Sequence, residues 1–432
     1  MLITGRLLAV AAVGIVPALL PLPAWAGPAW VLLVLLVAIG DAIAAPSPRR
    51  LVVSRTVPGS VRLSGTVTCG LVLRSTVARR SRLLVRDAWV PSAGATGNRH
   101  RLVLPGGEAR RLTTTLRPVR RGDLEAAGVA VRSYGPLGLA ARQSDLDAPA
   151  RLRVLPEFTS RRHLPSRLAR LREMDGRSAV QVRGEGTEFD SLRQYVVGDD
   201  VRSIDWRATA RRSEVVVRTW RPERDRRVLI VLDTGRTSAV RAGSGTRLDA
   251  GIEGALLLAA LASHAGDRVE LVAFDRALRA RVAGVAGARL LPVVADALSD
   301  VEPSLLETDW PGVVALTREQ LSQRALVVLV TALDPAAVMA GLLPVAGQLT
   351  SRHTVVLASV SPEAEAPPGG EAVPTPGADV YDRAAQERVR LDRDAVGRVL
   401  ARDGVVVVQG DAEQLAPRLA DTYLDLKAAG RL

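Results

Sequence analysis

Short apolar runs that alternate with helical stretches occupy the second half of the sequence. Strands buried on both faces of a parallel sheet require such uninterrupted runs. The intervening helices supply the right-handed crossovers that connect parallel strands. Residues 227–432 are therefore expected to form a doubly wound, mostly parallel α/β sheet. The expected strands are Val228–Leu232, Val269–Phe274, Leu326–Val330, Thr354–Ala358 and Val405–Val408, and the expected helices are Leu248–His264, Arg289–Leu298, Val313–Leu321, Ala336–Leu349 and Glu413–Ala429.

Two apolar runs open the chain, Leu7–Leu22 and Ala29–Ala45, joined by an uncharged turn. Each approaches the ~20 residues that a helix needs to cross ~30 Å of hydrocarbon. Arginines flank the outer ends of the pair, and such residues mark the cytoplasmic side of a membrane. Residues 1–50 are therefore expected to form a transmembrane helical hairpin, a multi-pass anchor in the cell membrane with the soluble domains in the cytoplasm. Asp41 is expected to reach the membrane interface from its position near a helix end.

A cleaved signal peptide is the alternative interpretation of the first run. Arg6, the apolar run and Ala24-Trp25-Ala26 imitate the three regions of such a peptide. The second run would then remain as a stop-transfer span with Arg49 and Arg50 behind it. The C-terminal portion would be cytoplasmic in either case.

Residues 51–156 carry short runs of alternating apolar and polar residues, such as Val61–Val67, Arg101–Leu104 and Val129–Tyr134. Side chains alternate across a strand, so these runs predict half-buried strands. Turn signals separate the runs at regular intervals, which favours a small β-sandwich of immunoglobulin-like type. No residue pattern here indicates chemistry, so an interaction or spacer role is expected.

The charge balance bears on the partners. A net charge of +13 favours phosphate-bearing partners, either the membrane lipid bilayer or nucleic acid. Between residues 151 and 227, however, the arginines are interleaved with carboxylates and lack the alternating aromatic residues that single-strand binders use. The lipid bilayer is therefore the expected partner, and nucleic acid is not.

Residue types needed for catalysis are scarce in this sequence. The lone Cys69 excludes an intramolecular disulfide and a C-x-x-C motif. Lys427 is the only lysine, and no P-loop surrounds it. The four histidines have no local acid or nucleophile. A non-enzymatic protein is expected, and a metal-dependent hydrolase or a nucleic-acid-binding membrane protein are the alternatives.

Residues 157–226 are expected to link the β-rich region to the α/β region and to pack on the latter. Arginines, carboxylates and aromatic residues gather here, as if bidentate Arg–carboxylate pairs were shielded from water by the rings. Two interpretations stay open, a latch between domains and a recognition surface for a partner. The residues of this candidate surface are Glu188, Phe189, Arg193, Tyr195, Gly198, Asp199, Asp200, Arg202, Asp205, Trp206 and Arg211.

The run from Gly186 to Trp206, Gly-Thr-Glu-Phe-x-x-Leu-Arg-x-Tyr-x-x-Gly-Asp-Asp-x-Arg-x-Ile-Asp-Trp, resembles the domain of unknown function 58 family. The resemblance implies a membrane-anchored bacterial protein with a von Willebrand factor A-like α/β domain. It also implies a MoxR-type AAA+ ATPase as partner, with a role in assembly or maturation of a client complex. Other membrane or envelope proteins are further expected partners.

The end of the first expected strand of the α/β region carries Asp233-Thr-Gly-Arg-Thr-Ser238. Von Willebrand factor A domains carry Asp-x-Ser-x-Ser at this position, and its oxygens contact a divalent cation. Oxygen ligands suit Mg²⁺ and Ca²⁺. The resemblance thus implies a degenerate site with Asp233 and Thr237 as ligands, without a hydroxyl at Gly235 and with Asp334 as a substitute for the aspartate expected near Ala332. No threonine is evident in the loop after Asp275, and Asp233 can instead cap the following turn.

Overall fold

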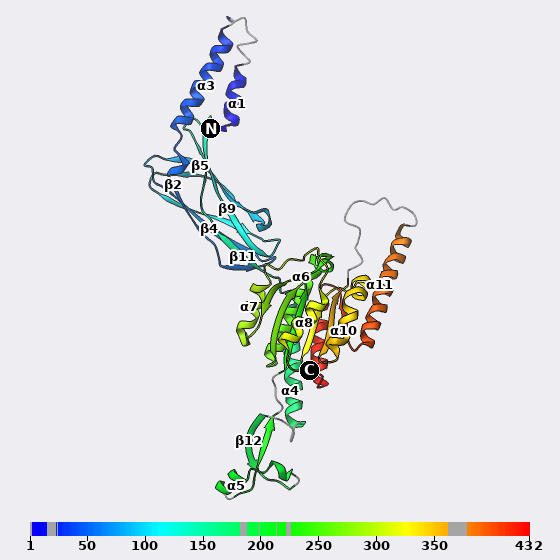
Figure 1. Ribbon diagram of the computed structural model, residues 1–432. Helices are drawn as coiled ribbons and strands as arrows, with labels where there is room; N and C mark the ends of the chain where they lie inside the picture. Colours follow the sequence, from blue (N-terminus) through cyan, green and yellow to red (C-terminus); the bar gives the residue numbers. More distant parts are fainter. Residues whose placement is uncertain are drawn as a thin grey trace. The chain divides into compact units, whose positions relative to one another are not determined.

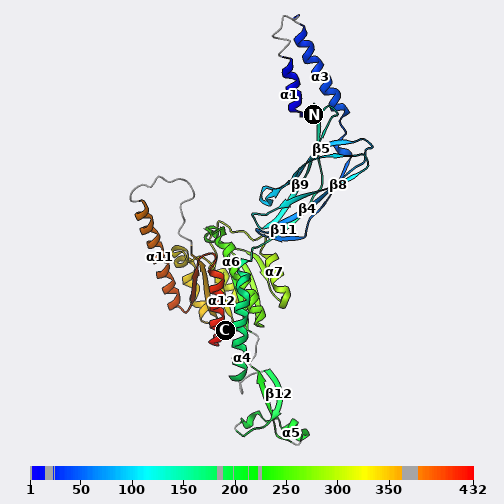
Figure 2. The ribbon, with the colours of Figure 1, turned by 180° about the vertical axis from the view of Figure 1, so that it is seen from behind.

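The computed structural model describes residues 2–14, 23, 25–181, 188–197, 199–212, 214–221, 226–361 and 378–432. The chain divides into two compact units, Met1–Leu155 and Pro156–Leu432 (Figure 1, Figure 2). Each unit has its own apolar core clusters, which share no residues with those of the other unit. The two units are therefore separate structural bodies, each with its own interior.

A six-stranded sheet forms the centre of the second unit, in the order β18-β17-β14-β19-β20-β21. Five strands run parallel, and β18 pairs antiparallel with β17 at one edge. The mixed α/β organisation expected from the sequence is confirmed, and the edge strand β18 is an addition to it. The strands are β14 (Arg227–Asp233), β17 (Arg268–Phe274), β18 (Leu278–Val282), β19 (Leu326–Val330), β20 (Thr354–Val360) and β21 (Val406–Gly410).

Helices cover both faces of this sheet (Figure 1). Alternate residues of β14 enter opposite clusters: Ile230 packs with one set of helices and Leu229 with the other. This division explains why the strands need continuous apolar runs. The first set is α6 (Arg247–His264), α7 (Leu290–Ala297) and α12 (Leu415–Ala428); the second is α8 (Trp310–Gln320), the consecutive α9 (Pro335–Ala337), η7 (Val338–Leu342) and α10 (Leu343–Thr350), and α11 (Ala378–Arg402).

Helix α6 packs closely against the sheet because its sequence provides a cap and small residues. The Thr246 hydroxyl accepts a hydrogen bond from the Asp249 backbone N–H at 3.2 Å, while the Asp249 carboxylate accepts one from the Thr246 N–H at 2.8 Å. This reciprocal pair satisfies two N–H donors at the helix start. At Gly251 a Cβ would lie 2.8 Å from Cγ1 of Val330, so glycine permits the close approach to β19.

Two sheets packed face to face form the β-sandwich of the first unit, because both contribute residues to shared core clusters. Val61–Val67 is not one strand, and that prediction is wrong. Strand β3 ends at Arg62, and the chain then turns, with a φ of 64° at Ser64. One sheet contains β2 (Leu51–Thr56), β4 (Val67–Ser75), β6 (Ala95–Thr96) and β8 (Ala109–Leu116); the other contains β1 (Leu2–Ile3), β3 (Ser60–Arg62), β5 (Ser81–Trp89), β7 (Arg99–Leu104), β9 (Gly122–Tyr134), β10 (Ala140–Leu146) and β11 (Arg151–Leu155).

The N-terminal apolar segments form α1 (Gly5–Val13) and α3 (Ala26–Ala44), which contact each other. Residues 15–22 of the first expected span lie outside the described residues. Within the described part of the chain, one helical stretch, Ala26–Arg50, is long and apolar enough to cross a membrane. A membrane anchor and a signal sequence share this character.

Asp41 does not reach an interface as expected, because it is 3% exposed and bonded to the β-sandwich. Its carboxylate accepts hydrogen bonds from the backbone N–H groups of Leu137, Leu139 and Ala140 at 2.8, 2.7 and 2.9 Å. The glycine-rich turn before β10 presents these donors together, and they satisfy the carboxylate within the protein. Helix α3 is thereby fixed to the sheet.

The only lysine of the chain has a structural role in the second unit. Lys427 on α12 forms an ion pair with Asp267 at 2.8 Å, and the side chains are 10% and 2% exposed. The Tyr423 hydroxyl donates to the same carboxylate at 2.5 Å. This cluster joins α12 to the turn between α6 and β17.

Candidate functional sites

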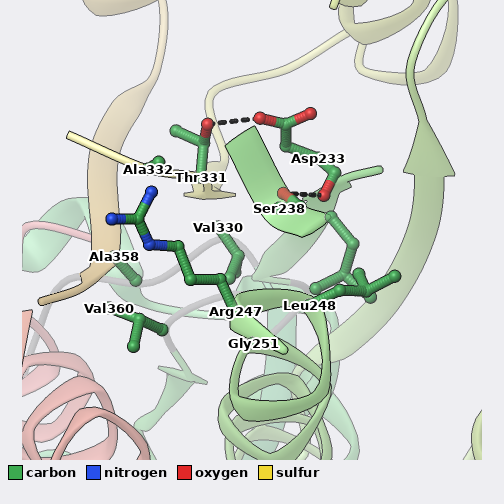
Figure 3. A pocket seen from close by; sticks show the side chains of 11 residues that line it. Asp233, Ser238, Arg247, Leu248, Gly251, Val330, Thr331, Ala332, Ala358 and Val360 are labelled. Carbon is green, nitrogen blue, oxygen red and sulfur yellow. Dashed lines mark hydrogen bonds between the residues drawn. The ribbon is translucent and has the colours of Figure 1, made fainter. Parts of the chain in front are cut away.

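The carboxyl ends of β14 and β19 meet at the centre of the sheet. Strand β14 lies between β17 and β19: the chain passes from β14 to β17 and β18 on one side, and then returns to β19 on the other side. Ligands of open α/β sheets bind at such a point, beyond the carboxyl ends of the strands. A small pocket lies here, lined by the strand ends and by the first turns of α6 (Figure 3).

Asp233, at the end of β14, receives hydrogen bonds from several elements and is 4% exposed. Its carboxylate accepts from the Gly235 N–H at 2.7 Å and from the hydroxyls of Thr308 and Thr331. Thr237 donates weakly to it at 3.5 Å. The bond from Thr331 is drawn in Figure 3. Three loops that are far apart in sequence therefore converge on one carboxylate.

Burial dominates the electrostatics of this carboxylate. Removal from water raises the pKa of Asp233, against the opposing effect of the hydrogen bonds from Thr308, Thr331, Gly235 and Thr237. Desolvation disfavours the charged form of an acid, whereas donors favour it. The neutral form of the Asp233 carboxyl group is therefore more favoured in the folded protein than it is in water.

The donor set around Asp233 does not fit a resident divalent cation. Asp334 does not contribute, because its carboxylate caps α9 by accepting from the N–H groups of Ala336 and Ala337. A Cβ at Gly235 would collide with the Thr308 hydroxyl, so the missing hydroxyl is replaced by that threonine. Among the described residues no group of three His, Cys, Asp or Glu side chains could hold a metal. One carboxylate, already occupied by four donors, is a poor match for Mg²⁺ or Ca²⁺.

Asp233→Asn is expected to leave the protein about as stable as the wild type at neutral pH, whereas Asp233→Ala should cost about 1–3 kcal/mol by leaving buried donors unpaired. Because the folded-state pKa is raised, wild-type stability should fall relative to Asp233→Asn as pH rises above about 4. Melting temperatures measured from pH 3 to pH 8 test this. A rise in melting temperature with Mg²⁺ or Ca²⁺ in the wild type, but not in Asp233→Asn, would contradict the conclusion that the donors around Asp233 do not fit a divalent cation.

A second candidate site is the antiparallel pair β12 (Glu188–Gln194) and β13 (Val216–Arg221) with its connection. Arg193 forms a bidentate pair with Asp199 at 2.6 and 2.7 Å, and Asp199 also accepts from the Val196 N–H. This bonding raises the pKa of Arg193. This ion pair joins Arg193 on β12 to Asp199 in the connection, so the two charges stabilise the local structure.

The remaining carboxylates also shape the connection. Asp200 caps η4 (Val201–Ser203) by accepting from the Arg202 N–H at 2.9 Å. Asp205 caps α5 (Trp206–Arg212) and accepts from Arg218 Nε at 2.8 Å. The N–H of Ala208 and the Arg218 guanidinium hold the pKa of Asp205 below its usual range. Asp199, Asp200 and Asp205, three of the acidic residues that the sequence singled out, therefore form an internal framework.

Apolar side chains of this connection face solvent instead. Val197 and Trp206 are 95% and 69% exposed, and Val196 and Val201 are exposed as well. We call these four residues the apolar loop surface. The expectation that the rings shield the ion pairs is wrong for Trp206, because the carboxylates are satisfied by backbone N–H groups and arginines without it.

The other predicted residues of the surface have varied positions. Tyr195 donates its backbone N–H to the Val215 carbonyl and is half-buried, while Arg202 and Arg211 are exposed. Glu188 and Phe189 pair with Arg221 and Trp220 across the strands, and their side chains lie outside the described residues. Gly198 lies outside them altogether.

The two units define a protein that combines a β-sandwich with an α/β sheet. The family model described as protein of unknown function DUF58 matches residues 191–398. The match covers a little less than half of the chain and confirms the resemblance inferred from the run ending at Trp206. A comparison with curated proteins gave no match.

Solved structures with some likeness each align with about a quarter of the chain. The ASH/PapD-like domain of human CEP192 is 12% identical, with 24% of this chain and 85% of that chain covered and a TM-score of 0.20. The FixG-related protein from Vibrio parahaemolyticus is 9% identical, with 24% and 96% covered and a TM-score of 0.18. The CARDB domain of PF1109 from Pyrococcus furiosus is 13% identical, with 24% and 87% covered and a TM-score of 0.16. Nothing about function follows from these likenesses.

Proposed function

We propose that this chain is a non-enzymatic binding protein, held in the cell membrane by an N-terminal helical hairpin, with a von Willebrand factor A-like unit in the cytoplasm. The contact between α1 and α3, seen side by side in both views, supports the hairpin (Figure 1, Figure 2). Arg6, Arg49 and Arg50 at the outer ends support the cytoplasmic side. The strand order, with a single antiparallel edge, supports the assignment of the α/β unit.

The observation that carries the proposal is the apolar loop surface. Isolated exposed apolar residues are ordinary, but here four occur within one short connection, whose shape is fixed by paired charges. Aromatic residues such as Trp206 are enriched at the centres of protein interfaces. The partner we propose is a MoxR-type AAA+ ATPase, acting with this chain on a client complex that includes other membrane or envelope proteins.

A surface variant tests this function directly. Val197→Asp combined with Trp206→Ala removes exposed apolar area without touching the paired charges. After photo-crosslinking in native membranes and purification in mild detergent, the wild type is expected to retain an AAA+ ATPase, and the variant to lose it at least ~10-fold.

Val119→Asp is the matched control, because this valine is 73% exposed in the other unit. It should retain the ATPase. If the folded wild type captures no ATPase, or the loop variant captures as much as the wild type, the proposal fails. No contact among the described residues favours the alternative functions, which are hydrolysis at a metal site and nucleic-acid binding.

A further inference from the structure

Both N-terminal helices are attached to the same end of the β-sandwich. The hydroxyl of Thr4, directly before α1, donates to the Gly138 carbonyl at 2.8 Å, and β1 pairs with β10. On α3, Asp41 accepts its three hydrogen bonds from the same stretch, residues 135–140. The short helix η1 (Pro48–Arg50) then leads directly into β2. This end of the sandwich therefore lies next to the segments that we propose enter the membrane (Figure 1).

The turn between β4 and β5 lies at this end as well. The carbonyl of Arg50 accepts hydrogen bonds from the Thr76 hydroxyl at 2.6 Å and from the Thr76 N–H at 3.1 Å. Thr76 is the first residue of the turn, which goes on to Arg79 and Arg80. Two arginines that are distant in sequence from the apolar helices are thus brought beside them by the fold.

Further arginines surround the turn that receives Asp41. Arg82, near the start of β5, donates to the Pro136 carbonyl at 3.3 Å. A Cβ at Gly138 would lie 3.2 Å from a guanidinium nitrogen of Arg6. We call the exposed arginines gathered here the basic end of the sandwich, and they are Arg6, Arg49, Arg50, Arg79, Arg80 and Arg82.

Carboxylates are scarce at the basic end within the part of the chain that the structure describes. Asp41 is buried and already bonded, and Glu108, whose carbonyl accepts from the Ser75 N–H at 2.9 Å, is the exposed acidic residue there. No carboxylate of the described residues lies within 4.0 Å of an arginine of the basic end. Inside the sandwich, by contrast, Arg55 is paired with Asp87. The basic end therefore carries positive charge that the protein does not neutralise.

Anionic phospholipid headgroups match this surface. The cytoplasmic face of a membrane has a negative potential that attracts arginines within a Debye length, ~8 Å at physiological salt. Leu137 and Ile43 at this end are 57% and 63% exposed, so apolar side chains flank the charges, as at other lipid-binding surfaces. Segments 48–50, 76–82 and 135–139 contain no aromatic residue, whereas single-strand nucleic-acid binders stack bases on such residues.

We propose that the basic end binds anionic phospholipid headgroups of the membrane in which the helical hairpin is anchored. The guanidinium groups donate to phosphate oxygens, and Arg79 and Arg80 contribute alongside the arginines that flank the apolar helices. This inference rests on the proposed membrane anchor and adds a lipid-binding surface on a folded domain. The β-sandwich is accordingly held against the bilayer by one of its own turns, in addition to its connection to α3.

Quenching by spin-labelled lipids tests how closely the β4–β5 turn approaches the bilayer. The full chain with Ala78→Cys carries a bimane fluorophore on the exposed turn. The native Cys69 does not compete for the label, because it is 1% exposed and burial raises the pKa of its thiol to about 11. The labelled chain is placed in nanodiscs of phosphatidylcholine with or without phosphatidylglycerol. Phosphatidylglycerol is expected to raise quenching by headgroup-labelled lipid about 2-fold or more, and about 1 M salt to remove the increase.

Arg79→Gln with Arg80→Gln is expected to lose most of that increase, because each arginine near an anionic surface strengthens binding roughly 5-fold. Arg99→Gln with Arg117→Gln is the matched control. Arg99 begins β7 and Arg117 follows β8, away from the ends of those strands that meet β5 and β4 beside the turn. The control should keep the increase. Melting curves and co-elution with nanodiscs establish that each variant is folded and inserted.

Retained lipid gives a second measurement that needs no label. After extraction of the full chain from membranes in mild detergent, lipid mass spectrometry counts the phosphatidylglycerol molecules that remain on it. The wild type and the control are expected to retain more of this lipid than Arg79→Gln with Arg80→Gln. Equal retention in all three would overturn the proposal.

The quenching experiment has outcomes of the same kind. Equal quenching with and without phosphatidylglycerol, or an increase that persists in the folded Arg79→Gln and Arg80→Gln variant, overturns the proposal. If the label responds to a DNA duplex and not to phosphatidylglycerol, the basic end is a nucleic-acid surface and the proposal also fails. A chain that does not enter nanodiscs would refute the membrane anchor and this inference with it. A chain that enters them without a lipid preference refutes this inference alone and leaves capture of the ATPase unaffected.

Discussion

Asp87→Ala is expected to destabilise the β-sandwich unit by about 3–5 kcal/mol, because it leaves the guanidinium of Arg55 buried without its charge partner. Arg55 lies on β2 and Asp87 on β5, so their ion pair connects the two sheets, and the side chains are 1% and 0% exposed. Arg55 also donates to the Gly128 carbonyl and lies 5.3 Å above the Trp89 ring, whose N–H donates to Asp87. Denaturant unfolding followed through tryptophan fluorescence measures the loss.

A double variant separates the value of the pair from the cost of breaking it. Arg55→Met with Asp87→Leu removes both charges, and buried pairs replaced in this way often recover most of the stability. We expect the double variant to be more stable than Asp87→Ala alone. A loss below about 1 kcal/mol in Asp87→Ala would show that the guanidinium escapes to water, contrary to its position in the structure.

Lys427→Met is expected to produce a loss of similar size, about 3–5 kcal/mol, in the α/β unit. The substitution leaves Asp267 buried, with the Tyr423 hydroxyl as the side-chain donor that remains among the bonds described for it. The unpaired carboxylate then loosens α12, which packs against α6 in the main core cluster. Thermal unfolding monitored by circular dichroism gives the magnitude.

Arg388→Met is the matched control for that variant. Arg388 forms an exposed ion pair with Asp392 on α11, with side chains 78% and 49% exposed. Such pairs contribute about 0.3–0.5 kcal/mol. Equal losses in Lys427→Met and Arg388→Met would mean that burial of the Asp267 pair has no energetic consequence.

The α/β sheet was predictable because its strands are apolar on both faces and its helices separate them in sequence. Helix α11 was not predicted, since its charged residues, such as Arg388, Arg390 and Asp392, mask any apolar stripe. The prediction of a strand over Val61–Val67 failed because the alternation of apolar and polar residues cannot by itself reveal a turn at Ser64. Local periodicity thus predicts elements with a strong apolar pattern and misses those whose pattern is diluted by charge.

The candidate sites were less predictable. Asp233 and Thr237 follow a strand and were proposed from the resemblance to von Willebrand factor A domains, but Thr308 and Thr331 reach the same carboxylate through the fold. The only sequence signal for Thr331 was its place directly after an apolar strand. The basic end was predictable only in part, because the arginines of the β4–β5 turn reach those that flank the apolar helices only through the fold.

The position of the only lysine has a practical consequence for studying this chain. Reagents that acylate side-chain amines have a single target here, and in the folded state that amine is bonded to Asp267 and Tyr423. Labelling of Lys427 should therefore report the opening of α12. Cross-linking mass spectrometry based on amine chemistry would find almost nothing on the native surface, so interface mapping needs reagents directed at carboxylates or at the numerous arginines.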